Sequence, residues 1–149
     1  MKTVNKFTLT IPSKSNNEAF ARAAVSAFVL QLDPTIDELS DIKTAVSEAV
    51  TNSIVHGYCD TIGKIYISAE IRDDHSVLIK IRDTGVGIEN IELAMQPLYT
   101  TGGEDRAGLG FAVMQSFMNS VRVKSKLGRG TTVTMQKKIS VRVGKNAII

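Results

Sequence analysis

A glutamate and an asparagine four residues apart are the chain's most informative pattern. Glu48 and Asn52 lie in a predicted helix that ends near Gly57. Residues four apart on a helix project from the same face, one turn above the other. The carboxylate can act as a general base, and the amide oxygen can ligate Mg²⁺, which takes few protein ligands beside phosphate oxygens and water. The pair indicates a phosphate-handling site, although Glu and Asn also occur together on ordinary exposed helix faces.

Two glycine-rich turns follow, and glycine lets a backbone approach a ligand closely. The first, Asp83-Thr84-Gly85-Val86-Gly87, ends a predicted strand, where Asp83 can accept the exocyclic amine of adenine. The second, Gly108-Leu109-Gly110, begins a predicted helix, whose N–H groups can hold an anion. Arg106, just before it, can donate to a terminal phosphate. Asp-Thr-Gly is also common turn chemistry, and the second turn can serve close packing alone.

Other nucleotide and metal signatures are missing. The sequence has no G-x-x-x-x-G-K-[ST] loop, no third glycine after Gly85 and Gly87, and no H-R-D or D-F-G motif. This argues against P-loop, Rossmann and protein-kinase-fold sites. His56 and His75, the two histidines, with the single Cys59 leave few ligands for zinc.

Composition predicts one cytoplasmic domain. The 149 residues are 43% hydrophobic and 22% charged, without the apolar stretch of a membrane helix, and the lone cysteine fits a reducing compartment. The net charge of +3 comes mainly from late lysines and arginines. Because only 5% of residues are aromatic, we interpret these cations as a solvated strand face and a basic tail, not as a nucleic-acid surface.

Periodicity places these residues on an alternating pattern of strands and helices. Strands are expected at 7–11, 64–71, 76–82, 121–125 and 131–135, and helices at 18–31, 36–56, 91–95 and 109–120. Thr35 and Glu38 match a capping box at the start of the second helix. Helical spacing predicts an inner face on each of the first two helices: Phe20, Ala24, Ala27 and Phe28 on the first, and Leu39, Ile42, Val46, Ala49 and Ser53 on the second. We expect an α+β two-layer sandwich, with a mixed, mostly antiparallel sheet covered on one face by helices. The domain is expected to span residues 1–140, followed by a short basic tail at 141–149.

The boxes Glu48-x-x-x-Asn52, Asp83-x-Gly85-x-Gly87 and Gly108-x-Gly110 resemble the N, G1 and G2 boxes of the GHKL ATPases over nearly the whole chain. Residues 28–35 and the Glu48–Asn52 box narrow the resemblance to the small anti-sigma factor serine kinases, above all those of sporulation. The resemblance implies a Bergerat-type fold, ATP and Mg²⁺, and a homodimer. It also implies two protein partners: an RNA polymerase sigma factor, which is bound and inhibited, and an anti-anti-sigma protein, which is phosphorylated on serine.

The resemblance also implies residue roles. Glu48 would be the catalytic base, Asn52 the Mg²⁺ ligand and Asp83 the adenine contact, with Arg106 near the terminal phosphate. Arg22 would engage the sigma factor, although an exposed helix arginine needs no such role. Residues 100–107 would form a lid. The remaining nucleotide contacts would be Gly85, Gly87, Thr100, Thr101, Gly108, Leu109, Gly110 and Thr132.

Three alternatives stay open. A histidine-kinase ATP domain would act on an attached helical hairpin, which we do not expect here. A nucleotide-gated binding module without transfer activity would need no base, so Glu48 argues against it. Stress-response anti-sigma kinases share all the boxes, so the boxes do not identify the sigma factor.

Overall fold

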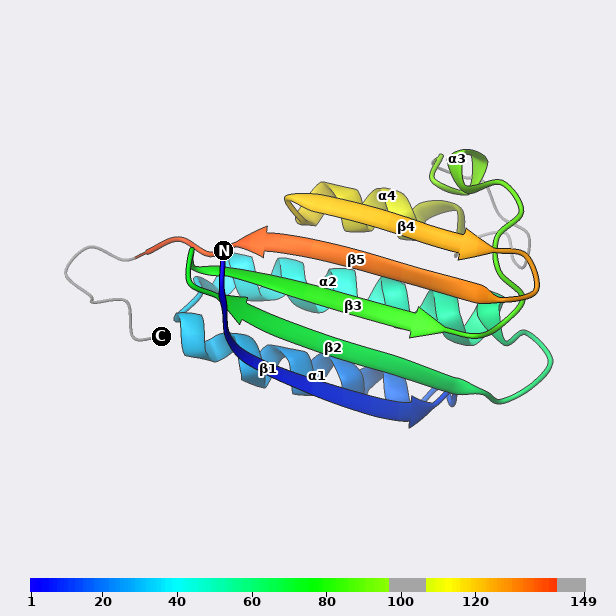
Figure 1. Ribbon diagram of the computed structural model, residues 1–149, viewed down its shortest axis with the longest axis horizontal. Helices are drawn as coiled ribbons and strands as arrows, with labels where there is room; N and C mark the ends of the chain where they lie inside the picture. Colours follow the sequence, from blue (N-terminus) through cyan, green and yellow to red (C-terminus); the bar gives the residue numbers. More distant parts are fainter. Residues whose placement is uncertain (97–106, 142–149) are drawn as a thin grey trace.

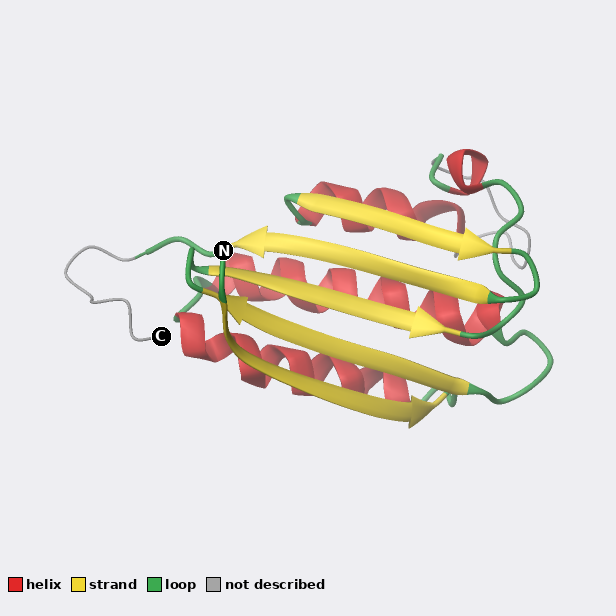
Figure 2. Ribbon diagram, in the orientation of Figure 1, coloured by secondary structure: helices red, strands yellow, loops and turns green. Residues whose placement is uncertain are grey.

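The helices cover one face of a single antiparallel sheet, as Figure 1 and Figure 2 show. The computed structural model describes residues 1–96 and 107–141. For residues 107–109 it describes the backbone alone. The strand order is β1-β2-β3-β5-β4, and each of these pairings is antiparallel. The strands are β1 (Thr3–Pro12), β2 (Lys64–Arg72), β3 (Ser76–Asp83), β4 (Ser120–Lys126) and β5 (Gly130–Lys138). The predicted α+β two-layer sandwich is confirmed.

Three longer helices form the second layer. They are α1 (Asn17–Val29), α2 (Ile36–Asn52) and α4 (Ala107–Phe117), and α2 lies between the other two (Figure 1). A 3-10 turn, η1 (Leu30–Leu32), follows α1, and a π-helical turn, η2 (Ser53–Gly57), extends α2. The one-turn helix α3 (Ile91–Ala94) lies at the end of the sheet where α2 and β3 finish. None of the helices within the described residues is long and apolar enough to cross a membrane.

The second predicted helix is confirmed in detail at its start. Thr35 Oγ1 accepts a 3.1 Å hydrogen bond from the Glu38 amide, and Glu38 Oε1 accepts one of 2.9 Å from the Thr35 amide. These two bonds satisfy amides that the helix itself leaves unpaired. Of the predicted inner stripe, Leu39 is half-buried and the other four residues are buried, namely Ile42, Val46, Ala49 and Ser53.

The predicted inner face of the first helix is wrong. It was expected at Phe20, Ala24, Ala27 and Phe28, but the buried apolar side chains are Ala21, Val25 and Val29. The large Phe20 side chain is 52% exposed. The buried stripe lies one position further along the helix, and Phe28 instead packs at its border, with its ring 4.8 Å from that of Phe7.

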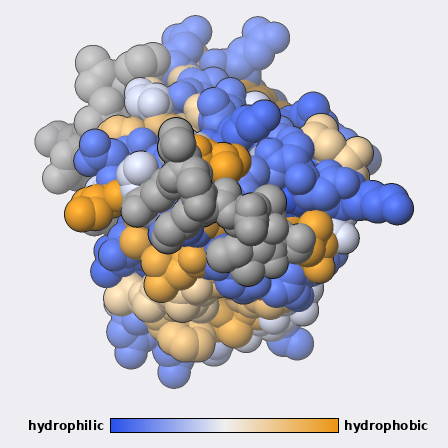
Figure 3. Space-filling view, turned by 90° about the vertical axis from the view of Figure 1, so that its left-hand side faces the viewer, coloured by the Kyte–Doolittle hydropathy of each residue, from blue (hydrophilic) through white to orange (hydrophobic). Residues whose placement is uncertain are grey.

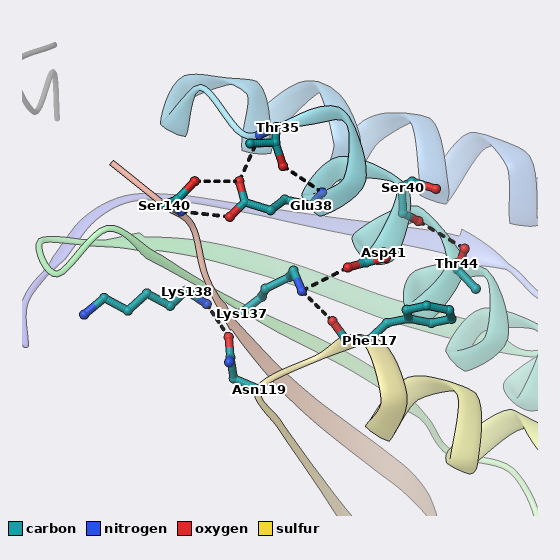
Figure 4. Close-up of polar contacts among 10 residues, drawn as sticks. All are labelled: Thr35, Glu38, Ser40, Asp41, Thr44, Phe117, Asn119, Lys137, Lys138 and Ser140. Carbon is teal, nitrogen blue, oxygen red and sulfur yellow. Dashed lines mark hydrogen bonds and ion pairs between the residues drawn. The ribbon is translucent and has the colours of Figure 1, made fainter. Parts of the chain in front are cut away.

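Polar contacts tie the start of α2 to the end of β5 (Figure 4), at the opposite end of the sheet from α3 (Figure 1). Ser140 donates to Glu38 through its amide, at 2.9 Å from Oε2, and through its hydroxyl, at 3.2 Å from Oε1. Lys137 Nζ donates to Asp41 Oδ2 at 3.3 Å and to the Phe117 carbonyl at 2.6 Å. Viewed from this end, hydrophilic residues surround smaller apolar areas (Figure 3). The hydrogen bonds of Ser140 and Lys137 therefore attach the start of α2 to the end of the sheet.

Candidate functional site

A cavity of about 840 Å³ opens at the end of the sheet where α2 and β3 finish. This volume lies within the range typical of small-molecule sites. Its described walls are the end of α2 with η2, the segment 86–94 that leads into α3, Phe111 of α4, and the β4–β5 hairpin. The cavity therefore includes residues of the first two boxes, Asn52, Asp83 and Gly87, and reaches Phe111, which directly follows the third box.

Asp83 is the buried acid of this cavity. Its side chain is almost completely enclosed, at 4% exposure, and it lines the cavity. Ser53 Oγ donates to its Oδ2 at 2.9 Å, and the Gly85 amide donates to its Oδ1 at 3.0 Å. An ionised carboxylate offers about four acceptor positions, so capacity remains for a donor on a ligand.

The π-helical end of α2 shapes the wall around Asp83. The Tyr58 amide donates to the Ser53 carbonyl at 3.0 Å, five residues back, which widens the last turn. Ser53 and Gly57 thereby both face the Asp83 carboxylate. A Cβ on Gly57 would lie 2.9 Å from Asp83 Oδ2, so a larger residue there would displace the carboxylate. Neither Ser53 nor Gly57 was predicted from the sequence as a site residue, because no periodic pattern marks the change from α- to π-helix.

The glycines after Asp83 serve backbone packing. Gly87 has a φ of +78°, and a Cβ there would come within 2.2 Å of the Lys126 carbonyl oxygen. Gly85 is not among the lining residues; a Cβ there would lie 2.0 Å from the Gly57 carbonyl oxygen. Gly87 lines the cavity, whereas Gly85 lets the loop lie directly on the end of α2.

Asn52 lines the cavity and has unused hydrogen-bonding capacity. Its Nδ2 is buried and has no hydrogen-bond partner within the described part of the chain. A Cβ on Gly110 would lie 3.0 Å from that nitrogen, so the first turn of α4 packs closely on Asn52. A buried N–H donor with an unmade bond fits an acceptor on a ligand, such as a phosphate oxygen. Gly108 and Leu109 belong to the same turn of α4, which begins two residues earlier than predicted.

Glu48 lies one turn before Asn52 in α2 and is half-buried, but it is not among the residues that line the cavity. The described residues contain no cluster of three or more His, Cys, Asp or Glu side chains that could hold a metal. The amide oxygen of Asn52 is the group on this wall that could ligate a magnesium ion.

Thr132 does not line the cavity, contrary to expectation. Thr131 and Val133 line it instead. Successive strand residues point to opposite faces, and the register pairs Thr131 with Asp83 but Thr132 with Arg82, on the other side of the sheet. β3 and β5 are not consecutive in the sequence, so only their register in the folded sheet identifies Thr131 as the residue on the cavity side.

Several predicted positions cannot be compared with the site. The lid segment, with Thr100, Thr101 and Arg106, lies outside the described residues, as does the tail from residue 142. Arg22 lies on α1 and is not part of the cavity. Its Nη1 is 3.3 Å from Glu18 Oε2 and donates to Ser47 Oγ at 3.3 Å, so α1 and α2 jointly orient it.

Comparisons with known proteins agree with this arrangement. Residues 11–137 match the family model of the histidine kinase-like ATPase domain. The chain is 57% identical over 139 residues to the anti-sigma F factor of Clostridium beijerinckii, covering 92% of this chain and 96% of that protein. It is 56% identical over 140 residues to the anti-sigma F factor of Thermoanaerobacter sp. (strain X514), covering 93% and 97%.

A solved structure with the same fold contains the RsbU and RsbW domains of Rv1364c from Mycobacterium tuberculosis. It matches with a TM-score of 0.69 at 21% identity, over 93% of this chain and 34% of that one. The structural match supports the fold, and the two curated relatives extend over nearly the full length of both sequences. The chain therefore belongs to the histidine kinase-like ATPase domain family and, with these relatives, to the anti-sigma F factor family.

Proposed function

We propose that this chain is a cytoplasmic anti-sigma factor with protein-serine kinase activity. It binds and inhibits an RNA polymerase sigma factor, the sporulation sigma F, and uses ATP to phosphorylate a serine of an anti-anti-sigma protein. The names and full-length coverage of its relatives support the sigma partner. The ATPase domain family supports the nucleotide.

The observation that carries the nucleotide site is that residues of two boxes line one cavity and the third box packs against one of them. Asp83 and Asn52 both line it, and Gly110 packs against Asn52. In this proposal Asp83 accepts the exocyclic amine of adenine, with Thr131 beside it in place of Thr132. Gly87 and the turn Gly108-Leu109-Gly110 hold the chain close to the nucleotide, and the start of α4 favours anionic oxygens.

The transfer step would depend on residues at the α2 end of the cavity. ATP with Mg²⁺ supplies the phosphoryl group and neutralises its charge when bound. Asn52 would offer its amide oxygen to the metal. Glu48, one turn earlier, would take the proton from the attacking serine hydroxyl. Arg106, with Thr100 and Thr101 in the lid segment, completes the contacts to the terminal phosphate. Positioning and charge neutralisation are the main requirements of this reaction class.

Phosphoserine formation tests this proposal. The protein is mixed with Mg²⁺-ATP and a candidate anti-anti-sigma protein, and phosphoserine is measured by mass spectrometry. We expect Glu48→Gln to lower transfer by about 10²-fold or more and to leave ATP affinity within about threefold, because a general base contributes about 10²–10⁴ in rate. Glu70→Gln is the matched control, because Glu70 pairs with Lys6 and Arg72 and does not line the cavity.

Two outcomes would contradict parts of the proposal. Tight ATP binding without any phosphoserine in the unmodified protein would mean that the protein is a nucleotide-gated binding module without transfer activity. Equal transfer by Glu48→Gln and Glu70→Gln would reject the base assignment.

For the proposed homodimer, the edge strand β1 offers unpaired backbone groups to a second copy, and sedimentation would detect the dimer.

A further inference from the structure

We propose that Tyr58 is a positioning residue that sets the preference of this site for a 6-amino purine over a 6-oxo purine. The inference rests on the proposed function, because it concerns how Asp83 is held toward the base. Tyr58 is not among the residues that line the cavity. Its side chain is buried behind the Asp83–Thr84 corner, the point where β3 ends and the chain leaves the sheet. It acts through the backbone that carries Asp83.

The hydroxyl of Tyr58 uses its full hydrogen-bonding capacity on this corner. It donates to the Lys64 carbonyl at 2.6 Å and accepts from the Thr84 amide at 2.8 Å. It also lies 3.0 Å from Thr84 Oγ1. A phenol has one donor and two acceptor positions, so with its proton on Lys64 the Thr84 hydroxyl donates to it. One hydroxyl thus joins the start of β2 to the residue after Asp83.

Glycines hold both the ring and the corner on their other sides. A Cβ on Gly63 would lie 2.3 Å from Tyr58 Cε1, so the chain before β2 lies directly on the ring. A Cβ on Gly130 would lie 2.1 Å from the Asp83 carbonyl oxygen, so β5 closes the corner from its own side. The Asp83–Thr84 peptide is therefore held between the Tyr58 hydroxyl and the first residue of β5.

The π-helical turn is what brings Tyr58 there. Its amide bonds to the Ser53 carbonyl at 3.0 Å, and this same turn directs Ser53 Oγ to Asp83 Oδ2. Ser53 and the Gly85 amide orient the carboxylate, while Tyr58 fixes the backbone from which it projects. A carboxylate acceptor fixed in this way bonds to a 6-amino group but faces a carbonyl oxygen on a 6-oxo base, where no bond forms. Sites built to bond a substrate N–H discriminate strongly against analogues that lack it.

The test compares ATP with inosine triphosphate, which has the same triphosphate and a 6-oxo base. Dissociation constants for both are measured by displacement of a fluorescent ATP analogue from the full-length protein with Mg²⁺. The unmodified protein should bind ATP at least about tenfold more tightly. In Tyr58→Phe, ATP affinity should fall about fivefold or more, and affinity for inosine triphosphate should change less than about twofold, because that ligand makes no bond to Asp83. A purely structural role would weaken both nucleotides equally.

Two further variants sharpen the result. Tyr66→Phe removes the same atom from a tyrosine on the outer face of β2, whose ring stacks under Arg82, and it should change neither constant. Gly63→Ala keeps the Tyr58 hydroxyl but pushes its ring, and it should reproduce the lost preference even if Tyr58→Phe proves too unstable to measure.

The outcomes separate the inference from the proposed function. Absence of ATP binding in the unmodified protein would overturn both. Preference for ATP in the unmodified protein with an unchanged ATP-to-inosine ratio in Tyr58→Phe and Gly63→Ala would overturn the role of Tyr58 alone. Equal weakening of both nucleotides would reduce Tyr58 to a structural residue and also overturn it.

Discussion

Gly130 lies directly on the backbone of Asp83. A Cβ on Gly130 would be 2.1 Å from the Asp83 carbonyl oxygen and 2.7 Å from the Thr84 Cα, and Gly130 also has a φ of +104°. The β4–β5 turn thus enters β5 in a conformation that favours glycine, against the strand end that carries the buried acid. Gly130 therefore serves both the β4–β5 turn and the packing behind Asp83.

This relationship predicts different costs for two neighbouring glycines. Gly128 has a φ of +80° but nothing within 4 Å of a Cβ, so Gly128→Ala should cost only the left-handed backbone penalty, about 1–2 kcal/mol. Gly130→Ala adds a collision with rigid backbone and should cost about 3 kcal/mol or more. Urea unfolding measures both. Similar costs for the two variants would contradict the proposed packing of Gly130 on Asp83.

The parts of the fold that follow from local rules were predictable. The capping box of Thr35 and Glu38 is a contact within one turn, and strand alternation in β2 and β3 needs only a period of two. The inner face of α1 was not predictable in the same way. Ala and Val alternate with Phe along that helix, and which side is buried depends on where α2 and the sheet lie. Tertiary packing therefore decided between two apolar stripes one position apart.

The sequence motifs of the candidate site were predictable, but the contacts that shape its walls were not. Asn52 and Asp83 share a cavity, as their spacing from glycine turns suggested. The change from α- to π-helix at Ser53 left no periodic signal, so the contact of Gly57 with Asp83 could not be foreseen. Thr132 was assigned by resemblance, and one residue of strand alternation separates it from Thr131 on the cavity side.

Arg22 gives a prediction for sigma binding that is separate from catalysis. Ser47 Oγ donates to Glu18 Oε2 at 2.7 Å, and Glu18 in turn pairs with Arg22, so the guanidinium is held in place while 40% of its side chain stays exposed. Arg22→Glu should weaken sigma capture about tenfold or more, because a held, exposed arginine suits an interface anchor and a reversed charge repels the same partner group. ATP affinity should not change. Biolayer interferometry with the purified sigma factor provides the measurement.

The matched control for this charge reversal is Lys80→Glu, an exposed lysine on β3 that points away from the helical layer, because its neighbours Ile79 and Ile81 are buried beneath the helices. It makes the same change in net charge without touching the Glu18–Arg22–Ser47 cluster. Equal loss of capture in the two variants would mean that net charge, and not the α1 surface, controls binding.

Glu38 predicts how stability depends on pH. Burial raises the pKa of this carboxyl, but the hydrogen bonds from Thr35 and Ser140 outweigh burial, so its pKa lies below the ordinary value of 4.5. A pKa that is lower in the folded than in the unfolded state stabilises the fold above pH 4.5, and this contribution is lost as pH falls through the folded pKa. Glu38→Gln should therefore lower the free energy of unfolding at pH 7, by about 1 kcal/mol or less because the interaction is a partly exposed set of hydrogen bonds. The difference from the unmodified protein should shrink below pH 4.5.

Urea unfolding between pH 7 and pH 3 measures this difference. Ser140→Ala removes one donor and keeps the carboxylate, so its free energy of unfolding should lie between those of the unmodified protein and Glu38→Gln. A difference that stays constant over the whole pH range would show that Glu38 acts through packing and not through its charge.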